Sequence, residues 1–386
     1  MSGGGIYKLI SRSVRCSGLS AVTLAIILIS ACAPPLGDSE ADLALEDIAA
    51  GYADSRLKAQ TPVPLRQSVR YRANGRRYQG DLYRSPEAVH AGIVLVPGVV
   101  PAGKNDPRLV ALAYTLARLR FAVLVPDLVG LRHLKVRRSD VREVADAFAY
   151  LLSRPELVPG GRAGIAGFSY GAGPVLLAGL EPDIREQVRF ILALGGYYDL
   201  YSIVSYFTTG YYRDEATGDW RYLAPRSYAA WVFGLSNADL LERPEDRSRL
   251  RTYLDELAEA DSGDEPLPPK GVAPDAEALL ALLGNRDPAR VPAFIARLSP
   301  SMRAELEGLN PAAHDLAALQ GEVILLHGRS DNIIPYTESV ALARSLRPGQ
   351  VELFLIEGFA HVDVQLKRRD IPQLLGVMQR LLDQRE

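Results

Sequence analysis

The sequence predicts an α/β fold in which helices cover both faces of a mostly parallel sheet. Short apolar, β-branched segments alternate with segments of helical periodicity through most of the chain. Such alternation is typical of βαβ units. The pattern is interrupted once, between residues 197 and 320, which indicates a mostly helical cap inserted over one end of the sheet.

The expected elements follow in order along the chain. Asn74-Gly75 joins two alternating segments, 68–73 and 77–83, and both turn positions need a positive φ, so an antiparallel hairpin opens the domain. Asp140 and Glu143 stand where a capping box would begin a helix. The expected parallel strands are 92–96, 122–125, 163–166, 190–194, 323–326 and 351–356, and the expected helices are 107–119, 141–152, 172–180, 337–345 and 371–382.

The predicted organisation has five parts. They are a signal peptide at 1–31, a tether at 32–66 with room for one short helix, a core at 67–196, the cap at 197–320, and the rest of the core at 321–386. Aromatic residues are frequent in the first third of the cap. They either form the small core of the cap or line an apolar pocket, and the sequence leaves both interpretations open.

The N-terminus is typical of an exported bacterial protein. Basic residues precede an apolar run, 19–29, and no acidic residue occurs before Asp38. The run is shorter than the roughly 20 residues that cross a bilayer. Ile29-Ser30-Ala31-Cys32 is similar to the lipobox of bacterial lipoproteins, which implies cleavage before Cys32 and a lipid on it. We therefore expect a protein of the cell envelope, anchored to a membrane by lipid on Cys32 and facing outside the cytoplasm. An ordinary export signal or an uncleaved anchor is the alternative.

Composition narrows the classes of function. The chain has 44 Lys and Arg against 46 Asp and Glu, with no basic block, so nucleic acid is not an expected partner. Neither a metal-binding motif nor a glycine pattern for dinucleotides or phosphates occurs in the sequence, and we expect no cofactor. Only Cys16 and Cys32 could form a disulfide, and cleavage before Cys32 would leave a single cysteine.

The motif that predicts chemistry is Gly167-Phe168-Ser169-Tyr170-Gly171, a Gly-x-Ser-x-Gly sequence. In this motif the serine lies on a strained turn between a strand and a helix, and the glycines let neighbouring backbone pass closely. A strand is expected directly before Ser169 and a helix directly after it. A nucleophilic serine needs a base, and the chain has five histidines, at positions 90, 133, 314, 327 and 361.

Five landmarks in one order resemble the α/β-hydrolase family over residues 68–384, apart from the cap. They are Pro97-Gly98, Pro126-Asp127-Leu128-Val129-Gly130, Gly167–Gly171, Gly328-x-x-Asp331 and Gly358-x-x-His361. The resemblance implies the α/β-hydrolase fold and a triad of Ser169, His361 and Asp331. Asp199 is the rival for the acid, because it follows the previous strand. His327 is expected to shape the end of its strand.

The resemblance also implies an oxyanion hole. One donor would be the backbone N–H of Tyr170, and the other that of Val99, behind Pro97-Gly98. The chain lacks the His-Gly-Gly-Gly sequence of one esterase branch. Asp127 is expected to stabilise a turn, with a catalytic part as the alternative. Lys104 is expected to be a solvated loop residue, with contact to a substrate anion as the alternative.

Together these features predict a serine hydrolase that cleaves a carboxylic ester through an acyl-serine at the cell envelope. The expected partner is a small-molecule ester or amide. A peptidase or amidase on the same fold is one alternative, since Ser-Tyr-Gly also occurs in serine peptidases of this family. A non-catalytic binding lipoprotein is another, which a degenerate triad would favour.

Overall fold

A computed structural model describes residues 37–260, 266–360, 363–364 and 368–386. Its centre is an eight-stranded sheet in the order β1-β2-β4-β3-β5-β6-β9-β10. β2 pairs antiparallel with β1 and β4, and all other neighbours are parallel. The strands are β1 (Leu65–Ala73), β2 (Arg76–Arg84), β3 (Ala91–Val96), β4 (Phe121–Pro126), β5 (Ala163–Phe168), β6 (Phe190–Leu194), β9 (Glu322–Gly328) and β10 (Val351–Ile356).

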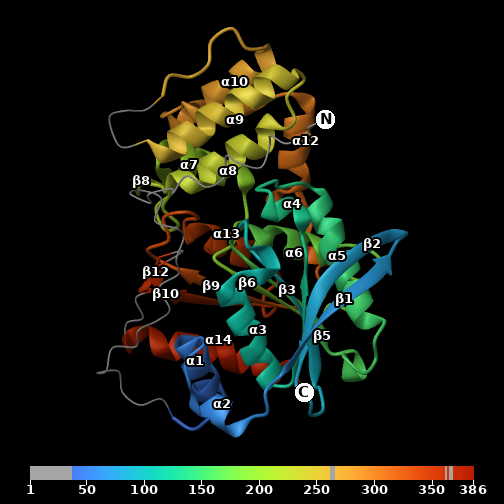
Figure 1. The fold of residues 1–386 in the computed structure, drawn as a ribbon. Coiled ribbons are helices and arrows are strands. Elements are labelled where there is room, and N and C mark those ends of the chain that lie inside the picture. The colour runs from blue at the N-terminus through green and yellow to red at the C-terminus, as the bar shows by residue number, and fades with distance from the viewer. Residues whose placement is uncertain (1–36, 261–265, 361–362, 365–367) are drawn as a thin grey trace, which may run out of the picture.

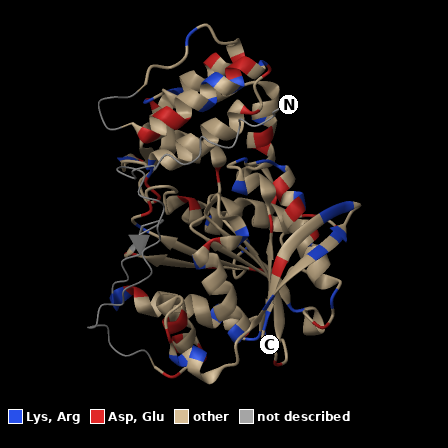
Figure 2. Cartoon of the chain, in the orientation of Figure 1, with Lys and Arg blue, Asp and Glu red and all other residues tan. Residues whose placement is uncertain are grey.

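The sheet has the character that its sequence predicts. Every residue of β3 and β4 is buried, and the four strands β3 to β6 carry no charged side chain (Figure 2). Near-continuous apolar strands are expected where both faces of a parallel sheet are covered. The predicted hairpin turn is confirmed, because Asn74 and Gly75 have φ of 47° and 76° and Ala73 pairs with Arg76.

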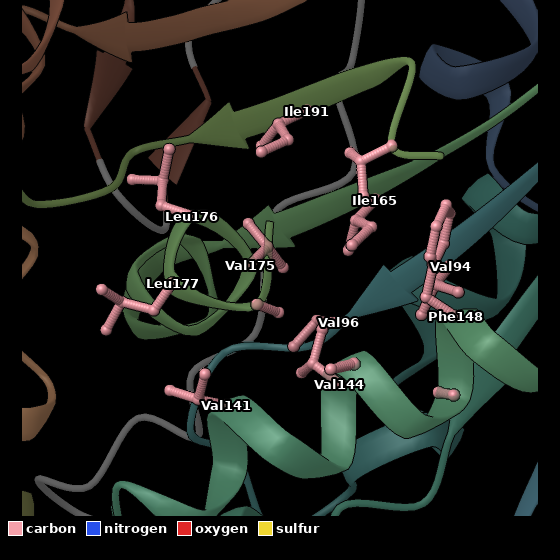
Figure 3. Packing of buried hydrophobic residues seen from close by; sticks show 14 of the residues in the cluster. Val94, Val96, Val141, Val144, Phe148, Ile165, Val175, Leu176, Leu177 and Ile191 are labelled. Carbon is pink, nitrogen blue, oxygen red and sulfur yellow. The ribbon is translucent and has the colours of Figure 1, made fainter. Parts of the chain in front are cut away.

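Helices cover the two faces of the sheet (Figure 1). On one face α5 (Ser139–Leu152) and α6 (Ala172–Ala178) pack on strand residues such as Val94, Ile165 and Ile191 (Figure 3), and α13 (Thr337–Ser345) packs on β9 and β10. On the other, α3 (Pro107–Arg118) and α14 (Ile371–Asp383) pack on residues such as Leu95 and Leu192. A short helix, α4 (Val129–Arg132), follows β4. The predicted fold class, an α/β-hydrolase fold with a mostly helical cap, is confirmed by this architecture.

The cap lies between β6 and β9 and has a hydrophobic core of its own (Figure 1, green to orange). Several of its aromatic residues, including Tyr206 and Phe233, are buried, whereas Trp220 and Tyr222 are exposed. Its elements are α7 (Leu200–Thr209), β7 (Tyr211–Arg213), β8 (Trp220–Tyr222), α8 (Ser227–Ala238), α9 (Pro244–Glu259), α10 (Pro274–Leu283), α11 (Val291–Arg297) and α12 (Pro300–Gly308). In the part of the chain that the structure describes, no helix has both the length and the apolar character needed to cross a membrane.

The segment expected to be a tether is in large part folded onto the core. Residues 40–60 form α1 (Glu40–Ala50) and α2 (Arg56–Gln60), and α1 lies against α3 and α14. The carboxylate of Asp47, 2% exposed, accepts a hydrogen bond from Thr115 of α3 at 2.6 Å. Arg385, near the C-terminus, donates to Glu40 and to the carbonyl of Leu119. The expectation of a tether through residue 66 is therefore wrong, because α1 buries an apolar face that only tertiary packing reveals.

Candidate active site

Ser169 lies at the carboxyl end of β5 in a strained backbone conformation. Its φ is 54°, in the left-handed region that non-glycine residues rarely adopt. β5 ends at Phe168, a 3₁₀ turn covers Ser169–Gly171, and α6 begins at Ala172. The strand and helix that the motif requires are therefore present on either side of the serine. The turn leaves Ser169 half-buried, lining a cavity.

The glycines around Ser169 allow two loops to approach closely. A Cβ on Gly171 would stand 2.6 Å from the carbonyl oxygen of Pro97, and a Cβ on Gly98 would stand 3.3 Å from the Cβ of Ser169. A Cβ on Gly167 would clash with the carbonyl of Gly171. The loop that follows β3, which carries Val99, is thus held directly beside the serine.

Asp331 lies at the same edge of the sheet, two strands away from Ser169. The carboxyl ends of β5 and β9 are separated only by β6, a spacing of about 10 Å. The carboxylate of Asp331 is 1% exposed and accepts hydrogen bonds from the backbone N–H groups of Ile333 and Ile334, at 2.8 and 2.9 Å. These bonds fix the carboxylate in the turn that follows β9.

His361 and Cys32 lie outside the described residues. The chain leaves β10 at Ile356, which pairs with Gly328 at the end of β9. The N–H groups of Glu357 and Gly358 then donate to the carboxylate of Asp370, both at 2.9 Å. The segment that carries His361 therefore starts at the edge of the sheet that holds Ser169 and Asp331.

Asp199, the rival for the acid, and His327, expected to shape the end of its strand, each have partners of their own. His327 is fully buried, and its ring nitrogens contact the Ser339 hydroxyl at 2.7 Å and the Ile334 carbonyl at 2.9 Å. Its Nε2 is also 3.5 Å from the carboxylate of Asp331. Asp199 begins α7 and accepts hydrogen bonds from the N–H of Tyr201 and the hydroxyl of Ser202. His327 thus ties the end of β9 to the following turn and helix, and Asp199 caps a helix.

Tyr170, the predicted oxyanion donor after the nucleophile, is fixed by its side chain. Its hydroxyl donates to Asp140 at 2.8 Å, and its ring stacks on Tyr197 with centroids 6.3 Å apart. Asp140 also accepts from the N–H of Arg137, at 2.9 Å. Asp140 therefore does not form the predicted capping box with Glu143. It is turned inward, 3% exposed, and burial raises its pKa to about 7.

Two tyrosines of the cap reach the site, and sequence reasoning assigned neither a role. Tyr228 donates to the carbonyl of Val99 at 2.6 Å, so α8 holds the loop that follows β3. The hydroxyl of Tyr206 is buried and finds no hydrogen-bond partner among the described residues. Burial, and then the nearby carboxylate of Asp331, raises the pKa of Tyr206 above its usual value. Only the folded cap brings these two side chains to the sheet edge.

A cavity of about 660 Å³ contains Ser169 in its wall and extends in two directions. The part that we call the cap branch lies beneath α7, α8 and α12, and its wall includes Arg137, Ser236 and Glu305. The part that we call the interlayer branch lies between the sheet and the helices α1, α3 and α14. Its wall is formed mainly by Leu45, Ile48, Leu95, Leu109, Leu112, Leu116, Phe168, Leu192, Leu194, Leu326, Leu374, Val377, Met378 and Leu381, and Tyr52, Asp106 and Arg108 line it next to the end of α1 and the start of α3.

Two further charged residues near the site are structural. Lys104 forms an ion pair with the buried carboxylate of Asp81 at 2.8 Å. The expectation of a solvated loop lysine is therefore wrong, and the alternative contact with a substrate anion has no support either. Asp127 bonds to Gln79 and to Arg132, both at 2.8 Å, as expected for a residue that stabilises a turn. Among the described residues, no group of three or more His, Cys, Asp or Glu could hold a metal ion.

Comparison with protein-family models and with curated protein sequences found no match. Solved structures that resemble the chain include the Pyrococcus horikoshii acylaminoacyl peptidase, with 11% identity and a TM-score of 0.47 over 84% of this chain and 42% of the peptidase. A dienelactone hydrolase from Anabaena variabilis has 13% identity and a TM-score of 0.43, over 83% of this chain and 97% of its own. The esterase domain of a Rhodothermus marinus protein has 16% identity and a TM-score of 0.41, with the same coverage.

Proposed function

We propose that the chain is a serine hydrolase that cleaves a carboxylic ester through an acyl-serine intermediate. The observation that carries the proposal is the backbone of Ser169, with φ of 54° at the tip of a buried strand. Such a conformation costs about 1–3 kcal/mol and persists where the surrounding structure enforces it, most often at functional sites. Here the close approach of Gly98 and Gly171 enforces it, beside a cavity that can admit a substrate.

The proposed reaction has two steps. The hydroxyl oxygen of Ser169 attacks the ester carbonyl while His361 takes its proton, and the N–H groups of Tyr170 and Val99 stabilise the oxyanion. Collapse breaks the bond to the alcohol, which leaves with the proton from His361. Water, deprotonated by His361, then attacks the acyl-serine. The bond to Oγ of Ser169 breaks, the proton returns from His361 to that oxygen, and the carboxylic acid is released. Asp331 holds the imidazole and stabilises its charged form.

The assignment of Asp331 as the acid is supported by its surroundings. It is buried beside the end of β9 and two backbone donors fix its carboxylate, whereas Asp199 is engaged in capping α7. An Asp331→Asn variant should lose most activity, and an Asp199→Asn variant should keep most of it. The reverse result would transfer the role to Asp199.

One experiment tests the nucleophile and the reaction class. The purified protein is treated with a fluorescent fluorophosphonate, alongside Ser169→Ala and His361→Ala, and is then assayed on p-nitrophenyl esters and on aminoacyl anilides. We expect labelling of the wild type only, and turnover of the esters. Equal labelling of Ser169→Ala would refute the assigned nucleophile. Turnover of anilides without esters would replace the esterase with the peptidase alternative.

We also propose that the protein is anchored at the bacterial cell envelope through lipid on Cys32. The support is the N-terminal sequence alone, an apolar run that ends in Ile29-Ser30-Ala31-Cys32. Mass spectrometry of the protein from membranes should find a chain that begins at Cys32 and carries a diacylglyceryl group. A Cys32→Ala variant should lose the modification. An unmodified full-length N-terminus would contradict the proposal.

A further inference from the structure

We infer that the interlayer branch of the cavity binds the acyl chain of a long-chain fatty acyl ester, with the carbonyl carbon at Ser169. This inference rests on the proposed function and names its substrate class. The chain would run from the serine into the space between the sheet and the helices α1, α3 and α14. The cap branch would then hold the alcohol half of the ester.

The lining of the interlayer branch matches a hydrocarbon chain. Most of its side chains are aliphatic. Its polar residues are Tyr52, Asp106 and Arg108, next to the end of α1 and the start of α3, and the last two form an ion pair with each other. The cap branch also has many apolar residues, but it has more polar groups, because Arg137, Ser236, Asn237 and Glu305 are in its wall. An apolar cavity of this kind excludes water and binds apolar ligands. The hydrocarbon part of an ester therefore fits the interlayer branch, and its more polar part fits the cap branch.

The interlayer branch begins directly at the nucleophile. Phe168, the residue before Ser169, packs on the α3 and α14 side of the sheet, whereas Tyr170, the residue after it, packs on the opposite side and on the cap. Leu95, two residues before Pro97 in the neighbouring strand, lies on the same side as Phe168. Ser169 thus stands where the two branches meet, as an ester with its two halves in different branches requires.

The two faces of the sheet are packed differently. On the face of α5 and α6, residues such as Val144, Phe148 and Val175 fill the space against the strands (Figure 3), and neither helix contributes to the cavity wall. On the other face, side chains that lie between the sheet and the helices remain only half-buried. They include Ile48, Leu112, Phe168, Leu194 and Leu374. The exposed area of these side chains is the surface that an acyl chain would cover.

The cavity is large enough for a long chain. An apolar cavity of about 150 Å³ holds benzene, which has six carbons, so a volume of about 660 Å³ has room for roughly 25 carbons in both branches. The interlayer branch touches four adjacent strands, β3, β5, β6 and β9, a width of about 14 Å. A flexible chain of a dozen or more carbons can extend along this width, whereas a short acyl group would fill only a small part of it.

The first test is a series of p-nitrophenyl esters from C2 to C16, assayed below the concentrations at which they aggregate. Each methylene that becomes fully buried raises kcat/KM by at most about fourfold. We expect kcat/KM to rise at least about 100-fold from C2 to C12. Alkyl acetates, in which the long chain is on the alcohol, should show no comparable rise. A flat acyl series, or an equal rise for the acetates, would overturn the inference.

Substitutions at the wall locate the chain. Leu374→Trp, or Leu112→Trp as a second variant, fills the interlayer branch and should lower the C12 to C2 ratio of kcat/KM at least tenfold. Leu152→Trp is the matched control, because Leu152 is a half-buried leucine on the opposite face of the sheet and away from the cavity. The C12 to C2 ratio of this variant should equal that of the wild type. Ala229→Trp fills the cap branch instead. If it lowers the C12 to C2 ratio while the two interlayer variants leave that ratio unchanged, the inference is overturned.

A binding measurement separates this inference from the proposed function. The Ser169→Ala variant should bind a fluorescent C16 fatty acid, and adding Leu374→Trp should weaken that binding at least tenfold while circular dichroism shows a folded protein. Absence of binding would refute the acyl site. If the fluorophosphonate labels Ser169 but chain length has no effect, only this inference fails. If Ser169 is not labelled, the proposed function itself fails.

Discussion

Asp140 makes the stability of the protein depend on pH in a direction opposite to that of most carboxyl groups. Its side chain is buried behind the nucleophile turn, where it accepts from the hydroxyl of Tyr170 and from the N–H of Arg137. Burial is the main cause that raises its pKa from 3.8 to about 7, and the nearby carboxylate of Glu143 adds to it. The folded protein thus holds a proton that the unfolded chain releases near pH 4.

The size of the effect follows from this difference in pKa. Between pH 4 and pH 7 the unfolded chain has lost the proton that the folded chain keeps, so the free energy of unfolding falls as the pH rises. A pKa difference of about 3 units corresponds to about 4 kcal/mol. The stability that Asp140 contributes is complete below pH 4, declines between pH 4 and pH 7, and is lost above pH 7. Asp140→Asn removes this decline, because an amide does not titrate. The amide oxygen can accept from the same two donors, so the local structure is kept.

Urea unfolding of the wild type and Asp140→Asn at pH 5, 6, 7 and 8 measures the effect. The stability of the variant relative to the wild type should increase by about 3 kcal/mol from pH 5 to pH 8. Glu338 is a second buried carboxyl whose pKa burial raises to about 7, and it contributes equally to both proteins. Glu338→Gln should therefore show a separate change of the same sign. Parallel curves for the wild type and Asp140→Asn would mean that the carboxyl is ionised throughout, and the reasoning would be refuted.

Three further predictions concern the turn at Ser169–Gly171 and the loop that follows β3. Ser169→Gly should abolish turnover but be about 1 kcal/mol more stable to urea than Ser169→Ala, because glycine adopts the left-handed backbone without strain. Equal stabilities of the two variants would show that the turn is unstrained. Gly171→Ala should lower the free energy of unfolding by about 1–3 kcal/mol and slow fluorophosphonate labelling, because the added Cβ meets the Pro97 carbonyl. A variant that is labelled as fast as the wild type would contradict the geometry. Tyr228→Phe removes the hydrogen bond to the Val99 carbonyl and should lower kcat/KM up to about tenfold with little change in KM. An unchanged kcat would exclude a positioning role for Tyr228.

Features determined by short stretches of sequence were predictable. The turn at Asn74-Gly75 needs two positive φ angles, and the two residues there are among the few that adopt them readily. The buried strands are recognisable because both their faces are apolar. The turn at Ser169 is likewise encoded in five consecutive residues, with glycines where backbone must pass closely.

Features that depend on distant partners were not predictable. Lys104 pairs with Asp81, which is 23 residues earlier in the chain. Asp140 has the sequence position of a cap residue, but its partner, Tyr170, is 30 residues away on another element. The helix α1 is too short to be stable alone, and its packing on α3 and α14 supports it in the folded protein. The two branches of the cavity arise from the packing of whole layers, which no local pattern specifies.

The position of α1 has a consequence for where the protein would work. Glu40 begins α1 and is held to the body by Arg385, and it follows Cys32 by only eight residues. With lipid on Cys32, a fully extended chain of that length would let the body stand at most about 30 Å from its membrane attachment. The same helix contributes Leu45 and Ile48 to the interlayer branch. The wall of the acyl site would then be built from the part of the protein nearest the bilayer, within reach of lipids that never leave the membrane surface.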